Sequence, residues 1–416
     1  MQRNDPVGRN ATYSERIEFV VELARRLHTY GTTAERLEGA VVSVARRLGL
    51  RCDPFSNPTG IILSFADARS GSKLADVTQM VRLEPGDIDL RKLCAADAIA
   101  ENVLADRTDI ASGSAALALL DRKPGWRAKV LGIASWGLSA AAVTGMLRSR
   151  WTDIVTAALI GCLIGALNLV GRRRPRIREA EGAIAAMIAT FLVAAVASFI
   201  VPLNTRSVII AALIVLMPGL SLTNAIAELT SQHLVSGSAR FAGACTQLLK
   251  LAFGTVAATQ LVQLLHWHPH EASLQLSPGW VEWPALLIGS YAFAVLFNAD
   301  RRDYWLVMAS VIVGYTVTRL SGIALGSGAG VFCGSLAITA LSNGYARLWN
   351  RPGALIRVPG IILMVPGSVG FRSLSFVFDH DVMLSINTGI AVFVVLVALV
   401  AGVLFGNLLI PARRNL

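Results

Sequence analysis

The hydrophobic positions of the chain follow two patterns, which change at the polar stretch 121–126. Before this stretch, apolar residues alternate with polar ones at helical or strand spacing. Beyond it they form long runs, and about 20 apolar residues suffice for a helix to cross a bilayer. Ten runs are predicted as membrane spans, at approximately 130–147, 154–170, 182–201, 207–224, 241–264, 283–298, 304–318, 322–343, 358–371 and 386–410.

Residues 1–125 are expected to form a soluble α+β domain. The spacing predicts helices at 14–28, 33–48, 90–105 and 110–120, and strands at 51–55, 60–65 and 74–83. A capping-box pattern from Thr32 to Glu35 opens the second helix, and the turn residues 68–71 separate the last two strands. The expected fold class is therefore an α-helical polytopic membrane protein with about ten transmembrane helices and an N-terminal α+β domain.

This domain contains no nucleophile motif, glycine-rich phosphate loop or metal-ligand cluster in its sequence. His28, Ser64, Asp87 and Asp89 are residue types of a hydrolase, but their spacing does not support one. We expect neither an enzyme nor a cofactor, and a regulatory or gating role for the domain. The alternative from another class is a membrane-tethered enzyme or sensor whose activity lies in this domain.

The charges support the same division of the chain. Only 16% of the residues are charged; Lys and Arg equal Asp and Glu up to residue 125, so the whole net charge of +11 lies beyond it. Most of these basic residues fall in every second gap between spans, which predicts cytoplasmic N- and C-termini in a cytoplasmic (inner) membrane. The gap positions disfavour nucleic acid as a partner. The first residues lack an apolar segment, so we expect no cleavable signal peptide.

A short internal repeat divides the membrane part into two halves. The sequence Ile-Val-Leu-Met-Pro-Gly at 214–219 returns as Ile-Leu-Met-Val-Pro-Gly at 362–367, with Pro218 and Pro366 148 residues apart. The predicted halves are 126–270 with spans 1–5 and 271–416 with spans 6–10. Because each half has an odd number of spans, the second would lie inverted relative to the first, as in many secondary transporters.

The fourth span of each half is interrupted by Pro-Gly, and this points to a binding site. Proline frees backbone carbonyls, and discontinuous helices at equivalent positions of two repeats mark the sites of transporters. A pair of structural kinks is the alternative. The predicted substrate-binding residues are Pro218, Gly219, Ser221, Thr223, Asn224, Glu228, Lys250, Pro366, Gly367, Ser368 and Arg372.

The charged members of this set have second interpretations. Lys250 lies inside a span and either faces a cavity or extends to the headgroups. Glu228 either carries a proton or pairs with Lys250, or it is a solvated loop residue. Arg372 either meets a carboxylate or anchors the outer interface. The spacing of His266, His268 and His270 suits an extended metal site, but we expect no metal in that outer loop.

Several stretches resemble the threonine/serine exporter family. They are GTTAERLE at 31–38, ARRLGL at 45–50, FSNPTG at 55–60, MPGLSLTNAI at 217–226 with Ser236 and Gly237, and VPGIILMVPG at 358–367 with Phe371 and Arg372. The resemblance covers residues 14–410 and implies an amino-acid exporter of the cytoplasmic membrane with ten spans. Two positions depart from the family pattern: Leu363 stands where proline is frequent, and Glu228 near a frequent Asp.

The expected function is secondary export of threonine, serine or similar small amino acids by alternating access. No nucleotide-binding motif is present, so the proton gradient is the expected energy source. The alternative substrate is an organic acid such as the dicarboxylate succinate. The expected partners are the amino-acid substrate, membrane lipid and a coupling proton; a homo-oligomer stays open.

Overall fold

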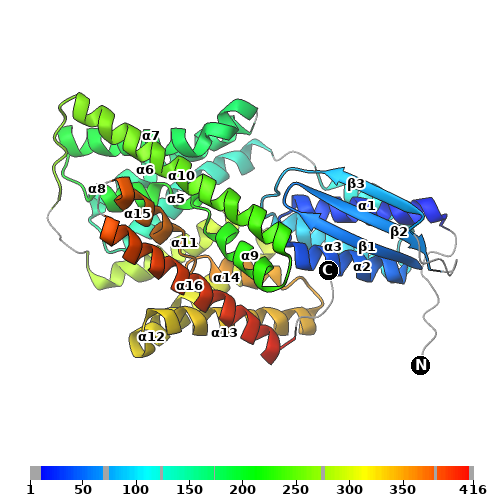
Figure 1. Cartoon of the computed structure of the whole chain (residues 1–416). Helices are drawn as coiled ribbons and strands as arrows, with labels where there is room; N and C mark the ends of the chain where they lie inside the picture. The colour runs from blue at the N-terminus through cyan, green and yellow to red at the C-terminus, as the bar shows by residue number, and fades with distance from the viewer. Residues whose placement is uncertain are drawn as a thin grey trace.

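The N-terminal domain packs its first two helices on a three-stranded sheet and its other two helices on the first (Figure 1). The computed structural model describes residues 11–68, 75–121, 125–172, 174–272, 277–378 and 382–411. The strands are antiparallel in the order β1-β2-β3. All the predicted helices and strands of this domain are confirmed within a few residues: α1 Tyr13–Thr29, α2 Ala34–Arg47, β1 Leu50–Asn57, β2 Gly60–Asp67, β3 Val77–Arg82, α3 Leu90–Leu104 and α4 Ile110–Leu119.

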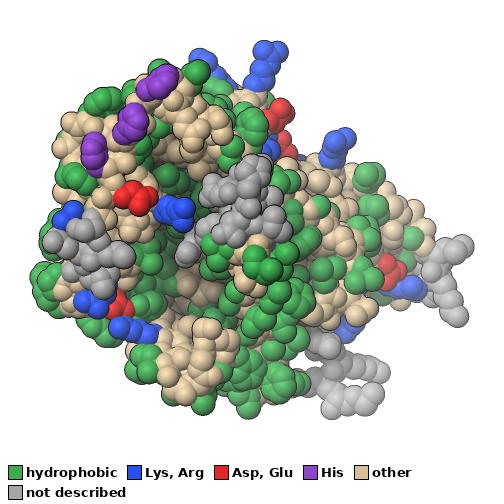
Figure 2. All heavy atoms as spheres, turned by 60° about the vertical axis from the view of Figure 1, so that its left-hand side comes forward, with side chains coloured by type: hydrophobic (Ala, Val, Ile, Leu, Met, Phe, Trp, Pro, Cys, Tyr) green, Lys and Arg blue, Asp and Glu red, His purple; other side chains and the backbone are tan. Residues whose placement is uncertain are grey.

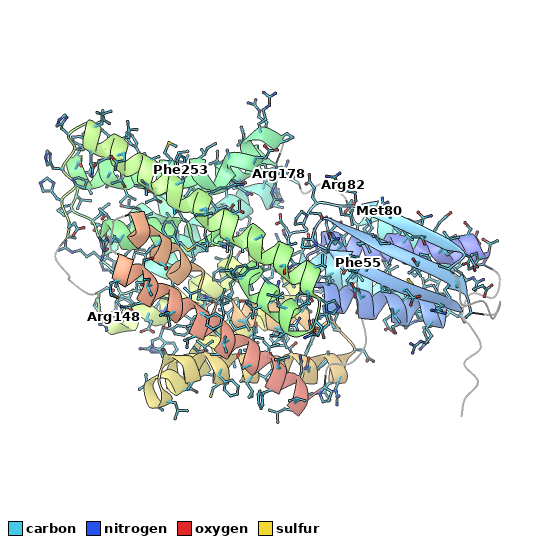
Figure 3. All side chains as sticks on the ribbon, viewed as in Figure 1. Phe55, Met80, Arg82, Arg148, Arg178 and Phe253 are labelled. Carbon is cyan, nitrogen blue, oxygen red and sulfur yellow. The ribbon has the colours of Figure 1, made fainter. Side chains whose placement is uncertain are left out.

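Alternation along β2 explains how this domain closes its core. Ile61, Leu63 and Phe65 are buried at every second position, as expected for a strand with one face on the core. Helix α1 contributes Phe19 and Leu23 to the same core. The other face of the sheet is open, and Figure 3 shows the exposed Phe55 and Met80 there.

Two local predictions about this domain have different outcomes. The capping box expected at Thr32 is wrong: the N-cap of α2 is Thr33, whose side chain makes no capping hydrogen bond. A capping box does open α1, between Thr12 and Glu15. The predicted turn at 68–71 lies largely outside the described residues.

The remainder of the chain is a bundle of helices, many of them apolar and long. Six helices are long and apolar enough to cross a membrane, or seven if the bent pair at 205–230 is one span, within the described ranges. The chain is therefore a multi-pass membrane protein, and the count of ten spans stays a prediction. The helices are α5 Trp126–Met146, α6 Trp151–Gly171, α7 Pro175–Phe199, α8 Thr205–Ala212, η1 Ile214–Leu216, α9 Gly219–Thr230, α10 Leu234–Leu264, η2 Gly279–Val281, α11 Glu282–Leu296, η3 Arg301–Asp303, α12 Tyr304–Leu325, α13 Ser327–Trp349, α14 Ala354–Ile361, α15 Gly367–Phe378 and α16 Val382–Leu409.

The surface of this bundle fits a lipid environment. Figure 2 shows hydrophobic side chains over much of the helical part, with scattered Lys, Arg, Asp and Glu side chains on the face toward the viewer. Exposed members on α10 and α16 include Phe253, Leu264, Phe393 and Phe405. In water such an apolar surface would drive association, whereas lipid tails cover it without cost.

The two ends of the bundle carry basic residues that the sequence assigns to opposite sides. Arg178 lies in the gap between the predicted spans 154–170 and 182–201, on the cytoplasmic side by the charge rule, and ion-pairs with Glu84 of the N-terminal domain at 2.7 Å. Arg148 lies in the preceding gap, on the outer side by the same rule, and is found at the end of the bundle away from that domain (Figure 3). Arg173, Arg413 and Arg414 lie outside the described residues. The separation of Arg178 from Arg148 agrees with the predicted sidedness.

Helices recur along the chain with the spacing of the sequence repeat. Gly219 and Gly367 begin α9 and α15, 148 residues apart, and a long helix follows each of them, α10 and α16. Contacts recur as well: α7 packs on α10 as α13 packs on α16, and α9 on α10 as α15 on α16. The two halves thus share an order of elements and a packing scheme, and their inversion stays a prediction.

The N-terminal domain is joined to the bundle through backbone and core. At the start of α3, the amides of Leu90 and Arg91 donate to the carbonyls of Phe297 and Asn298, at 2.9 and 3.1 Å. Leu90 is fully buried in one hydrophobic cluster with Phe293 of α11. Because these atoms would otherwise be exposed, the domain is docked on the bundle rather than tethered to it.

Candidate functional site

The two Pro-Gly breaks meet in the middle of the bundle. A Cβ atom added to Gly367 would lie 3.3 Å from the Cα of Gly219, and one added to Gly219 would lie 2.3 Å from Cγ1 of Val365. Glycine is therefore needed for the close approach of the two breaks. The structure brings together Gly219 and Gly367, as the repeat predicts, and the shared position argues against two unrelated kinks.

The chain around the first break is bent and interrupted. Helix α8 and the segment from Ile214 to Thr230 meet at 53°, with the bend next to Leu213, and further along this segment Pro218 is the N-cap of α9. A proline is tolerated at this place because the amide it lacks has no partner inside the helix. Helix α9 therefore starts at the centre of the bundle, and its C-terminal half extends to the N-terminal domain.

A large cavity lies where α9 reaches that domain. Its volume is about 870 Å³. One wall comes from the N-terminal domain, from α2, α3 and the connection before α2, and the other from α9, α13, α14 and α16. Of the predicted binding residues, three line it: Thr223, Asn224 and Glu228.

The other predicted residues do not line the large cavity, or their side chains are not among those that the structure describes. Pro218, Gly219, Pro366 and Gly367 form the breaks themselves, and the cavity does not reach them. Ser221 and Ser368 are half-buried next to these breaks and also do not line it. The Arg372 side chain lies outside the described residues, so its two interpretations stay open.

Glu228 acts as a bridge between the two parts of the chain. Its side chain is 1% exposed. Oε1 accepts from the Ala34 amide at 3.0 Å, at the start of α2, and Oε2 accepts from Ser236 at 2.8 Å. Arg240 donates to both oxygens at 3.1 Å. A carboxylate at a helix N-terminus is favourable, so Glu228 holds α2 against α9.

These contacts correct two predictions. Glu228 is not a solvated loop residue, and it pairs with Arg240 rather than with Lys250. Lys250, on α10, donates from Nζ to the Glu179 carbonyl at 2.8 Å. Glu179 lies in the first turns of α7, beside Arg178 and so near the N-terminal domain. This placement agrees with a lysine that extends toward the headgroups.

The cavity also contains charged residues that the sequence interpretation did not assign to the site. Arg36 lies on α2 and Arg357 on α14, and both line the cavity. Arg36 belongs to the stretch GTTAERLE, and Arg357 directly precedes the stretch VPGIILMVPG. No spacing rule connects them, because 320 residues and a domain boundary separate them. Their meeting depends on the docking of α2 onto the bundle.

Asp97 is the most perturbed acid in this wall. It lies on α3, is 5% exposed, and its Oδ1 has no hydrogen-bond partner among the described residues. Burial, followed by the nearby Glu101, raises its pKa to about 7, while Arg351 opposes the shift. Asp97 therefore changes protonation near neutral pH. Arg351 itself is held by Asp303 through two bonds of 2.7 Å.

A second, smaller cavity of about 160 Å³ lies toward the other end of the bundle. It is lined by Tyr315, Thr318, Arg319, Leu363 and Met364. Tyr315 and Arg319 both donate to Glu282 at the start of α11. The opposite end of α11 contacts the N-terminal domain, so the small cavity faces away from it. Residues 361–364, at the second break, separate the two cavities.

No metal site accompanies these cavities in the part of the chain that the structure describes. No group of three His, Cys, Asp or Glu residues is arranged there to hold an ion. His266, His268 and His270 follow the end of α10, in the connection to η2.

Comparisons with known proteins were made over the whole chain. A family described as "Putative threonine/serine exporter" matches residues 18–262. A second, described as "Threonine/Serine exporter, ThrE", matches residues 284–409. No solved structure matches the chain.

Curated relatives come from fungi. Pheromone-regulated membrane protein 10 of Eremothecium gossypii is 26% identical over 394 residues, covering 91% of this chain and 52% of the relative. An uncharacterised protein of Schizosaccharomyces pombe is 25% identical over 372 residues, covering 85% and 48%. The protein of the first name from Saccharomyces cerevisiae is 25% identical over 378 residues, covering 86% and 47%. The chain thus spans about half the length of these relatives.

Proposed function

Because the chain belongs to the threonine/serine exporter family, we propose that it exports small amino acids such as threonine and serine by alternating access. In this proposal the two five-span halves are inverted repeats, in the cytoplasmic membrane, with both termini cytoplasmic. The contact between the two breaks at Gly219 and Gly367 is the observation that supports it most directly. Broken helices that meet between two halves of similar packing are typical of secondary transporters.

The proposed mechanism starts from a state open toward the N-terminal domain. Substrate enters the large cavity, where Asn224 and the Thr223 hydroxyl are available to bind it. Residues 361–364 close the route to the small cavity. Rocking of one half against the other would move residues 361–364 past the bound substrate. The substrate would then face the small cavity. The Gly219–Gly367 contact would be the pivot.

An ion gradient is the proposed energy source, and the proton is the proposed coupling ion. The sequence contains no nucleotide-binding motif. Asp97, which lines the cavity, titrates near neutral pH. Export of preloaded threonine should therefore stop when a protonophore collapses the gradient. Export that continues at the same rate would contradict this coupling.

A dicarboxylate such as succinate is the second candidate substrate. It is favoured by one observation, the two arginines Arg36 and Arg357 that line the cavity. Vesicles loaded with labelled threonine or with labelled succinate separate the candidates: an amino-acid exporter releases the threonine and is inhibited by internal serine, and a dicarboxylate exporter releases the succinate. The principal test is release of threonine from such vesicles by the purified protein. Asn224→Ala should lower the rate, and vesicles without protein provide the baseline.

A further inference from the structure

Two cations in the large cavity have no counterion among the described residues. Arg36 faces it from the N-terminal domain and Arg357 from α14. Neither makes an ion pair or a hydrogen bond within the described ranges. The charges of the two arginines act on each other, and burial lowers the pKa of Arg36 to about 10. Glu35 is the acid whose charge acts on both, but it is exposed and forms no ion pair with either.

Two other cations around the cavity, Arg351 and His233, are paired, whereas Arg46 and Arg47 at its exposed rim have no carboxylate partner among the described residues. Arg351 binds Asp303 through both nitrogens, and His233 contacts Glu38 at 3.2 Å. A half-buried charge without a partner is costly in proportion to its loss of solvent, and two like charges add repulsion. The protein has carboxylates for Arg351 and His233, yet Arg36 and Arg357, which are less exposed than Arg46 and Arg47, have none. This difference indicates that their anion comes from outside the chain.

Unpartnered polar atoms in the same cavity point to a ligand independently of these charges. The hydroxyls of Thr32 and Thr223 and Oδ1 of Asp97 are buried without hydrogen-bond partners among the described residues. All three residues line the cavity. Buried polar atoms are usually satisfied, by protein, water or ligand. Three exceptions around one space are expected if a polar molecule occupies it during function.

We propose that the large cavity binds a small carboxylate-bearing molecule, whose carboxylate lies between the guanidinium groups of Arg36 and Arg357. Arginine forms planar paired hydrogen bonds that match a carboxylate. The role in export rests on the function proposed above, in which this molecule is the transported amino acid or dicarboxylate. The N-terminal domain then supplies half of the recognition site, because Arg36 reaches the substrate only when α2 is docked.

Binding to the full-length protein in detergent tests the site directly. The probes are L-threonine, L-serine and succinate, with L-threoninol, which lacks the carboxylate, as the matched negative probe. Arg36→Gln and Arg357→Gln should each weaken carboxylate binding by on the order of 10-fold or more, the effect of losing a charged hydrogen-bond partner. Arg82→Gln, at the exposed Arg82 of β3 (Figure 3), should leave it unchanged.

Thermal stability of the empty protein separates a binding role from a structural one. Arg36→Gln and Arg357→Gln should melt at the wild-type temperature or above it, because each removes one of two repelling, half-buried charges. Carboxylate should raise the melting temperature of wild type and fail to raise that of the variants. Variants that melt lower yet bind carboxylate like wild type would overturn the proposal. Equal affinity for L-threoninol and L-threonine would overturn it too, as would binding of inorganic phosphate in preference to all three carboxylates.

Transport in loaded vesicles distinguishes this proposal from the proposed function. If both variants export threonine or succinate with wild-type KM and rate, the arginine site is wrong and the exporter stands. If wild type releases neither substrate, yet carboxylate binding depends on Arg36 and Arg357, the site stands and the exporter is wrong. A raised KM for threonine alone identifies the amino acid as the ligand, and a raised KM for succinate alone identifies the dicarboxylate.

Discussion

At the scale of single residues, the centre of the bundle depends on glycines, because they leave room for the two Pro-Gly breaks to touch. Gly219 and Gly367 approach until a Cβ on either would be within 3.4 Å of the other's Cα. A similar close approach recurs between helices: a Cβ on Gly254 would meet the Ala183 carbonyl of α7, and one on Gly402 the Phe332 carbonyl of α13. Gly254 and Gly402 are 148 residues apart, so the repeat extends to the contacts that hold each half together.

Gly219→Ala is expected to disrupt the contact between the two Pro-Gly breaks. Its methyl group would lie 2.3 Å from Val365, which forces the two breaks apart. Overpacking of this kind costs about 1–3 kcal/mol, so we expect a lower melting temperature and a lower export rate. Gly243→Ala is the matched control, since its Cβ meets nothing within 4 Å and alanine favours the helix. Equal melting temperatures for the two variants would show that the breaks do not touch.

Asp97→Asn is expected to remove a pH dependence of stability. The folded-state pKa of Asp97 is raised from 3.8 to about 7, so the folded protein holds a proton that the unfolded chain releases at lower pH. Stability therefore falls as pH rises from about 4 to 7 and is lowest, on this account, above 7. Melting curves from pH 5 to 8 measure it. Asp97→Asn should flatten the wild-type decline, whereas Asp106→Asn, at an exposed position after α3, should preserve it.

At the scale of elements, the joint between α2 and α9 is made by one carboxylate. Glu228 accepts from the first amide of α2, from Ser236 and from Arg240. This joint closes the large cavity, because α2 and α9 are both in its wall. Any motion that separates the domain from the bundle must break these bonds or move α9 with the domain.

Glu228→Gln is therefore expected to loosen the docking of the N-terminal domain. It leaves Arg240 without its charge partner, at a cost of about 1–3 kcal/mol for an interrupted buried hydrogen-bond network. We expect a lower melting temperature and faster proteolytic release of the domain. Glu84→Gln also removes an ion pair to the bundle, with Arg178, but an exposed one, and should change neither readout. Unchanged proteolysis in both would contradict the joint.

The sequence predicts these elements well and their side-chain partners less well. Apolar periodicity fixed the helices and strands of the N-terminal domain because each pattern is local. The recurrence of Pro-Gly located the two breaks for the same reason. The partners of Glu228 and Lys250 were not predictable, since both depend on which helices neighbour α10. Arg36 and Arg357 were not among the predicted binding residues. They line one cavity only because the N-terminal domain docks on the bundle, and the local sequence patterns of these two parts do not predict that docking.

At the scale of the whole molecule, the fold has two distinct ends. The N-terminal domain, Arg178 and the large cavity lie at one end, and Arg148 and the small cavity at the other. The six or seven helices that qualify as spans connect them. This polarity is what an exporter needs, because loading and release take place on opposite sides of one membrane.

Labelling of single cysteines tests this polarity. In a background in which all five native cysteines are replaced, Arg148→Cys should react with a membrane-impermeant maleimide on intact cells. Arg178→Cys should react only after permeabilisation, because the positive-inside distribution places it in the cytoplasm. The reverse pattern would invert the orientation, and labelling of both from outside would exclude this arrangement of the chain.

The shared core around Leu90 has a consequence for how the protein is made. The hydrophobic cluster that buries Leu90 includes Phe293 and Phe297, which leave the ribosome almost 200 residues after α3 ends. At about 5–20 residues per second, translation takes roughly 10–40 s to supply them. During that interval the nascent domain presents an apolar face to the cytosol. Early synthesis of this protein is therefore a stage at which a chaperone, or rapid delivery to the insertion machinery, protects it from aggregation.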